Sequence, residues 1–290
     1  MFRPGFAMPL AAGIALVVSL LPAAAFSQTS PTTAPSTAPA APADANTAFL
    51  TKASSIYYST TKQGLTGFDC AVHPDWANIF KTVAIQKGIP PTEDQKPVAL
   101  LNTVKITMHA RLNGPGSGLD WNPPDPTAPP DQESIDLLNQ MHQGIGQTLQ
   151  GFLQFWAPFV NGSVIPDSPT GIEITKTAAG HSIHAVDGTT TLTEVLDTDD
   201  VLKEFYVETG GAKITFNPSY KPTPKGLLVS AFDATIVPPG ATPDKQQKMK
   251  VGVEYQTVSG FLIPSTLSMD VTGTGAFSFT FDGCTVNPAP

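Results

Sequence analysis

The sequence predicts an α+β fold in which a broad antiparallel sheet with one apolar face is covered by helices. From residue 172 onward, apolar and polar residues alternate as in strands that have one wet face. Residues 131–160 instead space their apolar side chains three or four apart, which places them on one stripe of an α-helix. Strands lie about 4.8 Å apart and a helix is about 10–12 Å wide, so the sheet must curl around its helices or leave an apolar groove.

The central helix has signals at both ends. Asp131 or Ser134 can cap its first turn, and Pro158 with Asn161-Gly162 marks its end. Its apolar stripe consists of Leu138, Met141, Ile145, Leu149, Phe152, Trp156 and Phe159.

Three glycines interrupt the same helix, namely Gly144, Gly146 and Gly151. Each costs about 1 kcal/mol relative to alanine in a helix interior. We expect them to mark either a close approach to a neighbouring backbone or a helix that moves.

Strands are predicted for eleven stretches, and short turn signals between the later ones imply antiparallel neighbours. The clearest is 276–282, where Phe277, Phe279 and Phe281 point to one face. The remaining predicted strands are 65–72, 103–112, 172–176, 181–186, 190–196, 201–208, 212–217, 227–237, 250–256 and 261–271, with helices at 47–63 and 75–87.

Residues 1–27 are expected to be a cleavable signal peptide, with Arg3, an apolar core over 10–21 and small residues near the exit. That core is too short to span a bilayer, which takes roughly 20 residues. Residues 28–45 are rich in Pro, Ala and Thr and are expected to form a disordered linker. The sequence therefore predicts a periplasmic or secreted protein with a single domain at 46–290 and no transmembrane segment in the mature chain.

The charge balance excludes one class of partner. The formal charge is -8, and removal of Arg3 with the leader leaves -9. Arg111 is then the only arginine, so no arginine cluster is available to bind phosphates. Nucleic acid is not expected as a partner.

The chain has two cysteines, Cys70 and Cys284. In an oxidising compartment we expect them to form a disulfide, which would stabilise the fold by about 4–5 kcal/mol in the chain-entropy model. Two separate buried thiols are the alternative.

Two stretches carry a resemblance to a known family. VEYQTVSGFLIPSTLSMDV at 253–271 has a strand with Tyr255, a turn ending at Gly260 and a strand with Ile263-Pro264, and GLTGFDCAV at 64–72 has the form of a first strand after an N-terminal helix. With the order of elements, the chain resembles the LolA-like superfamily of periplasmic lipoprotein and lipid carriers. The resemblance implies a half-barrel, a curled sheet with helices on its concave face, and acyl chains held there. It implies no catalytic residue, metal or cofactor.

Motifs for chemistry are weak. His181 and His184 lie three residues apart on a strand and therefore point to opposite faces, which argues against a shared metal. Asp197, Asp199 and Asp200 lack the glycine and distal glutamate of a calcium loop, so a hairpin turn is favoured. His73, His109 and His142 are isolated in sequence, and G-x-S-x-G and S-x-x-K are absent.

We therefore expect a non-enzymatic protein that binds a lipid or lipoprotein acyl chain, or another hydrophobic small molecule, with an envelope protein as a further partner. Two alternatives are a structural or protein-binding module of the cell envelope with a packed core, and a hydrolase with a dispersed site. The candidate ligand-lining residues, which equally suit a packed core, are Leu149, Phe152, Trp156, Phe159, Phe277, Phe279 and Phe281.

Overall fold

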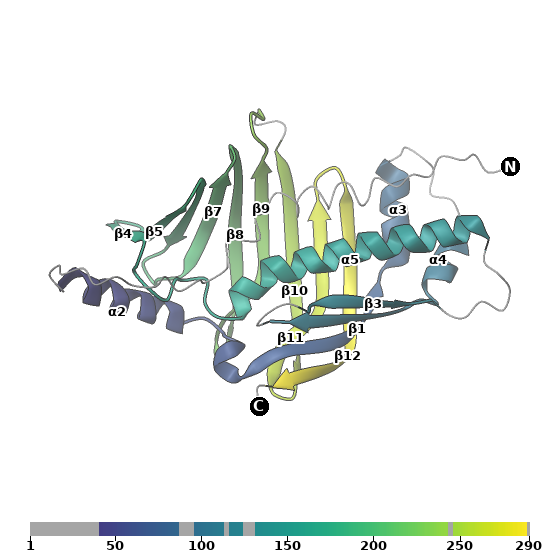
Figure 1. Ribbon diagram of the computed structural model, residues 1–290, viewed down its shortest axis with the longest axis horizontal. Helices are drawn as coiled ribbons and strands as arrows, with labels where there is room; N and C mark the ends of the chain where they lie inside the picture. The colour runs from purple at the N-terminus through teal and green to yellow at the C-terminus, as the bar shows by residue number, and fades with distance from the viewer. Residues whose placement is uncertain (1–40, 87–95, 113–115, 124–130, 243–245, 289–290) are drawn as a thin grey trace. The chain divides into compact units, whose positions relative to one another are not determined.

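The computed structural model describes residues 41–86, 96–112, 116–123, 131–242 and 246–288 (Figure 1). The predicted signal peptide and most of the predicted linker lie outside these residues. The helices are α2 (Ala41–Ser55), α3 (Trp76–Gln86), α4 (Lys96–Leu101) and α5 (Gln132–Val160), with a 3-10 turn η2 (Thr61–Gln63).

The strands form one open antiparallel sheet, as the α+β prediction required. They are β1 (Leu65–Pro74), β2 (Lys105–Arg111), β3 (Gly118–Asn122), β4 (Ile172–Thr177), β5 (Gly180–Asp187), β6 (Thr190–Leu196), β7 (Leu202–Thr209), β8 (Ala212–Thr223), β9 (Gly226–Val237), β10 (Gln247–Val258), β11 (Phe261–Val271) and β12 (Gly275–Pro288). Their order in the 12-stranded sheet is β3-β2-β1-β12-β11-β10-β9-β8-β7-β6-β5-β4.

The described chain divides into two compact units. Unit 1 contains the described residues of 63–157 and 251–288, and unit 2 contains those of 41–62 and 158–250. Both α5 and β10 contribute residues to each unit. No described helix is long and apolar enough to cross a membrane.

In unit 1, β1 pairs with β2 on one side and β12 on the other. The disulfide between Cys70 and Cys284 joins β1 to β12, which confirms the predicted pairing and excludes two separate thiols. Alternation also holds as predicted, because Ile106, Met108 and Ala110 of β2 are buried between more exposed neighbours. The strands of this unit therefore have one apolar and one wet face.

Helix α5 begins where the sequence indicated. The Asp131 carboxylate accepts a hydrogen bond from the Ser134 backbone N–H at 2.8 Å, which is an N-cap contact. The helix continues through Pro158 to Val160, so this proline lies inside the last turn rather than ending the helix.

The prediction of a helix at 47–63 is wrong in its second half. Helix α2 ends at Ser55, and Tyr57 instead forms a parallel bridge to Leu227. Leu227 N–H donates to the Ile56 carbonyl at 2.8 Å. A Cβ at Gly226, where φ is +120°, would lie 2.7 Å from the Tyr57 carbonyl carbon, so this approach needs glycine. A tertiary contact thus overrides helix propensity.

Strand β3 and helix α4 were not predicted. Trp121 of β3 stacks on His142 of α5 at 5.2 Å between ring centroids, and Trp76 of α3 packs edge-on to it at 6.4 Å. In a loop rich in Gly, Pro and Asp, Trp121 was the one signal for a packed strand.

In unit 2, strands β4 to β9 follow one another in chain order across the sheet (Figure 1). Each pairs antiparallel with the next, as the short predicted turns required. The Asp197 turn is confirmed as a hairpin turn, because the Asp197 carboxylate accepts hydrogen bonds from the backbone N–H groups of Asp199 and Val201.

Candidate functional site

The apolar face of unit 2 carries an aromatic cluster. We use this name for Phe159 at the end of α5 with Phe205, Phe216 and Phe232 of β7, β8 and β9. Phe159 lies 5.8 Å from Phe205 and 6.2 Å from Phe232 between ring centroids, and Phe205 stacks on Phe216 at 4.5 Å. All four rings are buried. Phe159 is thus the one predicted lining residue that joins the strands of unit 2.

A glutamate lies on the same apolar face. Glu194 of β6 pairs across the sheet with Ile183 of β5 and Phe205 of β7. Glu194 is only 4% exposed, and its Oε2 has no hydrogen-bond partner among the described residues. Burial raises the pKa of Glu194 to about 8, so the carboxyl is mostly protonated at neutral pH.

Sequence reasoning missed Glu194, although a signal was present. In the alternating strand it occupies the same face as Leu192 and Leu196, where an apolar residue is expected. A carboxyl at such a position must be paired, protonated or functional.

Two tyrosines lie near this carboxyl. The rings of Tyr57 and Tyr220 are 5.3 Å apart, and the Leu202 N–H donates to the Tyr57 hydroxyl at 2.7 Å. The Tyr220 hydroxyl is buried next to that of Tyr57, and the interaction between the two side chains adds to the raised pKa of Tyr220. Burial raises the pKa of Tyr57 to about 12 and raises that of Tyr220, and the Glu194 charge adds to both shifts.

We call Glu194, Tyr57 and Tyr220 the buried polar trio. A buried polar atom without a partner costs about 1–3 kcal/mol, so the Glu194 carboxyl is a substantial loss of stability. The trio borders the aromatic cluster, because Glu194 pairs directly with Phe205. An acid and two phenols beside aromatic rings can offer hydrogen bonds to a polar group of a mostly apolar molecule.

Helix α2 is attached to β5 and to the β6–β7 turn through a second buried acid. The Asp200 side chain is buried, and its Oδ2 lies 2.7 Å from Lys52 Nζ. His181 Nδ1 lies 3.2 Å from Asp200 Oδ1, a distance within ion-pair range, but the angle does not satisfy a hydrogen bond. Phe49 of α2 packs on the His181 ring at 4.3 Å.

The remaining predicted lining residues lie in unit 1 and are 0–5% exposed. The Trp156 ring contacts Phe152 at 5.8 Å and Phe68 of β1 at 6.0 Å, and its Nε1–H donates to the Tyr255 hydroxyl at 2.9 Å. The structure therefore divides the predicted set between the two units. Those in unit 1 are Leu149, Phe152, Trp156, Phe277, Phe279 and Phe281.

The glycines of α5 are not explained by a close backbone approach at two of the three positions. An ideal Cβ at Gly144 or Gly146 would meet no heavy atom within 4 Å beyond the helix's own nearby backbone. Gly144 is nevertheless buried, between Met141 and Thr148 on the covered side of the helix. The close-approach explanation is wrong for Gly144 and Gly146, and the other expectation, a helix that moves, stays a prediction.

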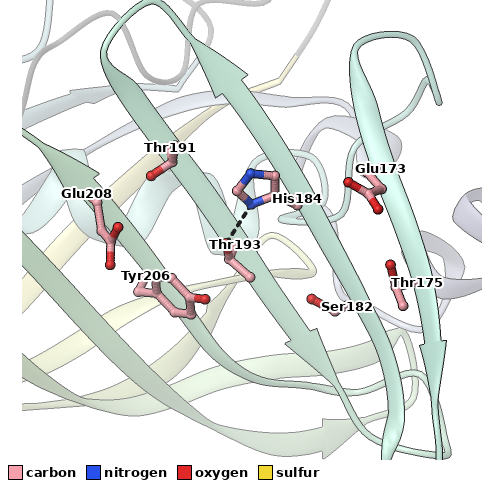
Figure 2. Close-up of a pocket in the computed structure, with 8 residues that line it drawn as sticks. All are labelled: Glu173, Thr175, Ser182, His184, Thr191, Thr193, Tyr206 and Glu208. Atoms are coloured by element: carbon pink, nitrogen blue, oxygen red, sulfur yellow. Dashed lines mark hydrogen bonds between the residues drawn. The ribbon is translucent and has the colours of Figure 1, made fainter.

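The wet face of unit 2 contains a hollow of about 350 Å³, which we call the polar hollow (Figure 2). His184 Nδ1 and the Thr193 hydroxyl form a hydrogen bond of 3.0 Å at its centre. The eight residues that line it are all polar and come from β4 to β7: Glu173, Thr175, Ser182, His184, Thr191, Thr193, Tyr206 and Glu208.

The other histidines are accounted for by neighbouring side chains. His184 opens onto the polar hollow while His181 meets Phe49, so the two point to opposite faces as predicted. His73 lies 3.0 Å from the Asp282 carboxylate. In the described part of the chain, no group of three His, Cys, Asp or Glu residues is arranged to hold a metal ion.

The wet face of unit 1 carries a charged network centred on Asp69 of β1. His109 Nδ1 and Arg111 lie 2.7 and 2.8 Å from Asp69 Oδ1, and His109 Nε2 lies 3.0 Å from Asp120. The hydrogen bonds to Asp120 and Asp69 raise the pKa of His109. Partial burial alone would raise the pKa of Asp69, but its bonds to His109, Arg111 and Asn287 lower it overall.

Comparison of the chain with protein-family models, curated proteins and solved structures finds no match. The functional argument therefore rests on the chemistry of these sites.

Proposed function

We propose that this is an exported, non-catalytic binding protein for an amphiphile, a molecule with a long acyl or alkyl chain and a small polar head group. One observation carries the proposal: the Glu194 carboxyl, whose Oε2 has no hydrogen-bond partner in the described part of the chain, is buried beside the aromatic cluster. The Cys70–Cys284 disulfide supports export, because such bonds persist in oxidising compartments.

The head group would bind at the buried polar trio. With a pKa near 8, Glu194 is a neutral acid at pH 7 that both donates and accepts a hydrogen bond. The Tyr57 hydroxyl accepts from Leu202 and keeps its own proton to donate. Neutral hydroxyl or carboxylic acid head groups match this set, because they also donate and accept.

The chain of the ligand would lie on the apolar face. The aromatic cluster, which includes Phe159 of α5, gives it apolar contact surface in unit 2. As the LolA-like resemblance implies, we propose that the sheet curls into a half-barrel with α5 on its concave side.

Entry of a ligand requires the covering helix to yield. Gly144 and Gly146 weaken α5 by about 1 kcal/mol each without being needed for packing against a neighbour. Local opening is drawn from the less stable parts of a fold, so this helix is the part of the cover we expect to move.

The test is a competition with ligands of equal chain length. The full chain is titrated with a fluorescent fatty acid probe, which is then displaced by dodecanol, dodecanoic acid or dodecyl trimethylammonium. We expect dodecanol and dodecanoic acid to displace the probe, and Glu194→Leu to weaken both at least tenfold. Glu204→Gln changes a half-exposed acid of β7 and is the matched control.

The competing function is the packed structural module of the envelope. It predicts that no probe is taken up, and that no lipid is found by mass spectrometry after extraction of natively purified protein. If Glu194→Leu takes up the probe as the wild type does, the protein binds lipid but the buried polar trio is not the head-group site.

A further inference from the structure

The polar hollow lies on the wet face of unit 2, at positions that alternate with the apolar face along the same strands. Cross-strand pairing places Glu173, His184, Thr193 and Tyr206 in one row over β4, β5, β6 and β7. This row alternates along the strands with the row that holds Glu194. The hollow is therefore independent of the amphiphile site proposed above.

Short hydroxyl side chains make the hollow. Thr175, Ser182, Thr191 and Thr193 occupy positions where the long charged residues of an ordinary wet sheet would fill the space (Figure 2). Thr193 forms the base and is only 6% exposed. The result is a depression with hydroxyl groups at its floor rather than a flat charged surface.

The longer side chains surround this floor, and those on the β5 and β7 strands have partners that hold them in place. Figure 2 shows Glu173 on the β4 side and Glu208 and Tyr206 on the β7 side. Lys213 Nζ lies 3.2 Å from the Glu208 carboxylate and 3.9 Å from the Tyr206 ring centre. His184 is fixed by its bond to Thr193. Glu208, Tyr206 and His184 are therefore restrained at the border of the hydroxyl floor, and Glu173 adds a second acid on the β4 side.

We infer that the polar hollow binds one sugar unit of a neutral carbohydrate. A sugar presents several hydroxyl groups that donate to carboxylates such as Glu173 and Glu208 and exchange hydrogen bonds with the Thr and Ser hydroxyls. Its C–H faces pack on an aromatic ring, which Tyr206 supplies. The volume of about 350 Å³ lies at the small end of ligand pockets, which span about 300–1,000 Å³.

Charge complementarity favours a neutral occupant over an anionic one. Glu173 and Glu208 would repel phosphate or carboxylate groups, and Lys213 is already paired with Glu208. A phosphorylated or uronic sugar is thereby disfavoured.

The experiment is an NMR titration of the isotope-labelled full chain with glucose, N-acetylglucosamine and the trisaccharide of each. We expect millimolar binding, with shift changes confined to residues of β4 to β7. Thr193→Val removes the hydroxyl at constant size and Tyr206→Ala removes the ring, and each should weaken binding at least tenfold. Thr235→Val makes the same change on β9, two strands from the lining, and should leave binding unchanged.

Thermal unfolding of each variant separates loss of a contact from loss of the fold. The inference is overturned if none of the sugars shifts the wild-type spectrum at tens of millimolar. It is also overturned if a folded Thr193→Val binds as wild type does, because the sugar would then occupy another place. Glucuronic acid binding more tightly than glucose would contradict the charge argument.

Discussion

Two rows of residues run across β5 to β8 and alternate along the strands, one on the apolar face and one on the wet face. One row is Ile183, Glu194, Phe205 and Phe216, and the other is His184, Thr193, Tyr206 and Thr215. The second row carries hydroxyl and imidazole groups, and two of them, His184 Nδ1 and the Thr193 hydroxyl, are hydrogen-bonded to each other. The first places a single carboxyl among apolar side chains. The comparison shows that the environment of a polar side chain depends on the face of the sheet that it occupies more than on its residue type.

Acids on the two faces respond oppositely to their surroundings. Burial raises the pKa of Glu194 to about 8, whereas hydrogen bonds from His109, Arg111 and Asn287 outweigh burial and lower that of Asp69. An acid with partners is stable as a charge, and an acid without them is stable only when protonated. Glu194, which lacks partners, is therefore a candidate binding residue, whereas Asp69 belongs to a charged network on the surface.

The largest difference in stability between the two rows should come from truncating the aromatic residue of β7 in each of them. Phe205→Ala removes a buried ring stacked on Phe216 and should lower the free energy of unfolding by about 3–5 kcal/mol. Tyr206→Ala removes a half-exposed ring on the wet face and should cost about 1 kcal/mol. Urea unfolding of both variants measures the difference, and equal losses would show that the two faces are equally packed.

The second contrast is the pH dependence of stability. The pKa of Glu194 is 4.5 ordinarily and about 8 in the fold, so the folded state retains a proton that the unfolded state has lost. Stability from this group is complete below pH 4.5 and declines as the pH rises through 8. Glu194→Gln should remove most of that decline between pH 5 and 9, whereas Glu204→Gln should retain it.

Urea midpoints at several pH values measure this effect. A wild-type profile that is flat over the same range would mean that Glu194 has a hydrogen-bonding partner in solution. Its carboxyl would then not be free to bind the head group of a ligand.

A third, smaller effect concerns the glycines of helix α5. Gly144→Ala should raise the free energy of unfolding by about 1 kcal/mol, because a Cβ there meets no neighbouring atom within 4 Å and alanine favours the helix. If α5 must open to admit a ligand, the same change should slow uptake of the fatty acid probe. Gly226→Ala is the opposite control, since its Cβ would collide with Tyr57 and should destabilise.

The alternation of apolar residues was enough to predict most of this fold. The strands of unit 2 and the stripe of α5 follow from patterns that each segment carries by itself, and the disulfide follows from the presence of two cysteines in a chain expected to be exported. The end of α2 did not follow, because the bridge between Tyr57 and Leu227 joins residues far apart in sequence.

The candidate site was harder to predict than the fold. Leu192 and Leu196 flank Glu194 on its face, which marks it as anomalous, but that its Oε2 has no partner among the described residues is known only from the folded sheet. The polar hollow depends on four strands in register, and no single strand contains its pattern. Sites assembled across strands carry little local signal.

The smallest expected effect is on the wet face of unit 1. The pKa of His109 is raised by Asp120 and Asp69, so its stabilising contribution is complete below its ordinary value of 6.5 and is lost as the pH rises through the raised one. The pKa of Asp69 is lowered, so its contribution is lost as the pH falls below 3.8. His109→Gln should cost below about 1 kcal/mol at pH 6, because the pairs are partly exposed, and less at pH 9. Thermal unfolding at the two pH values measures this. A loss as large as that of Phe205→Ala would show that charged contacts of the wet face contribute as much as aromatic packing does.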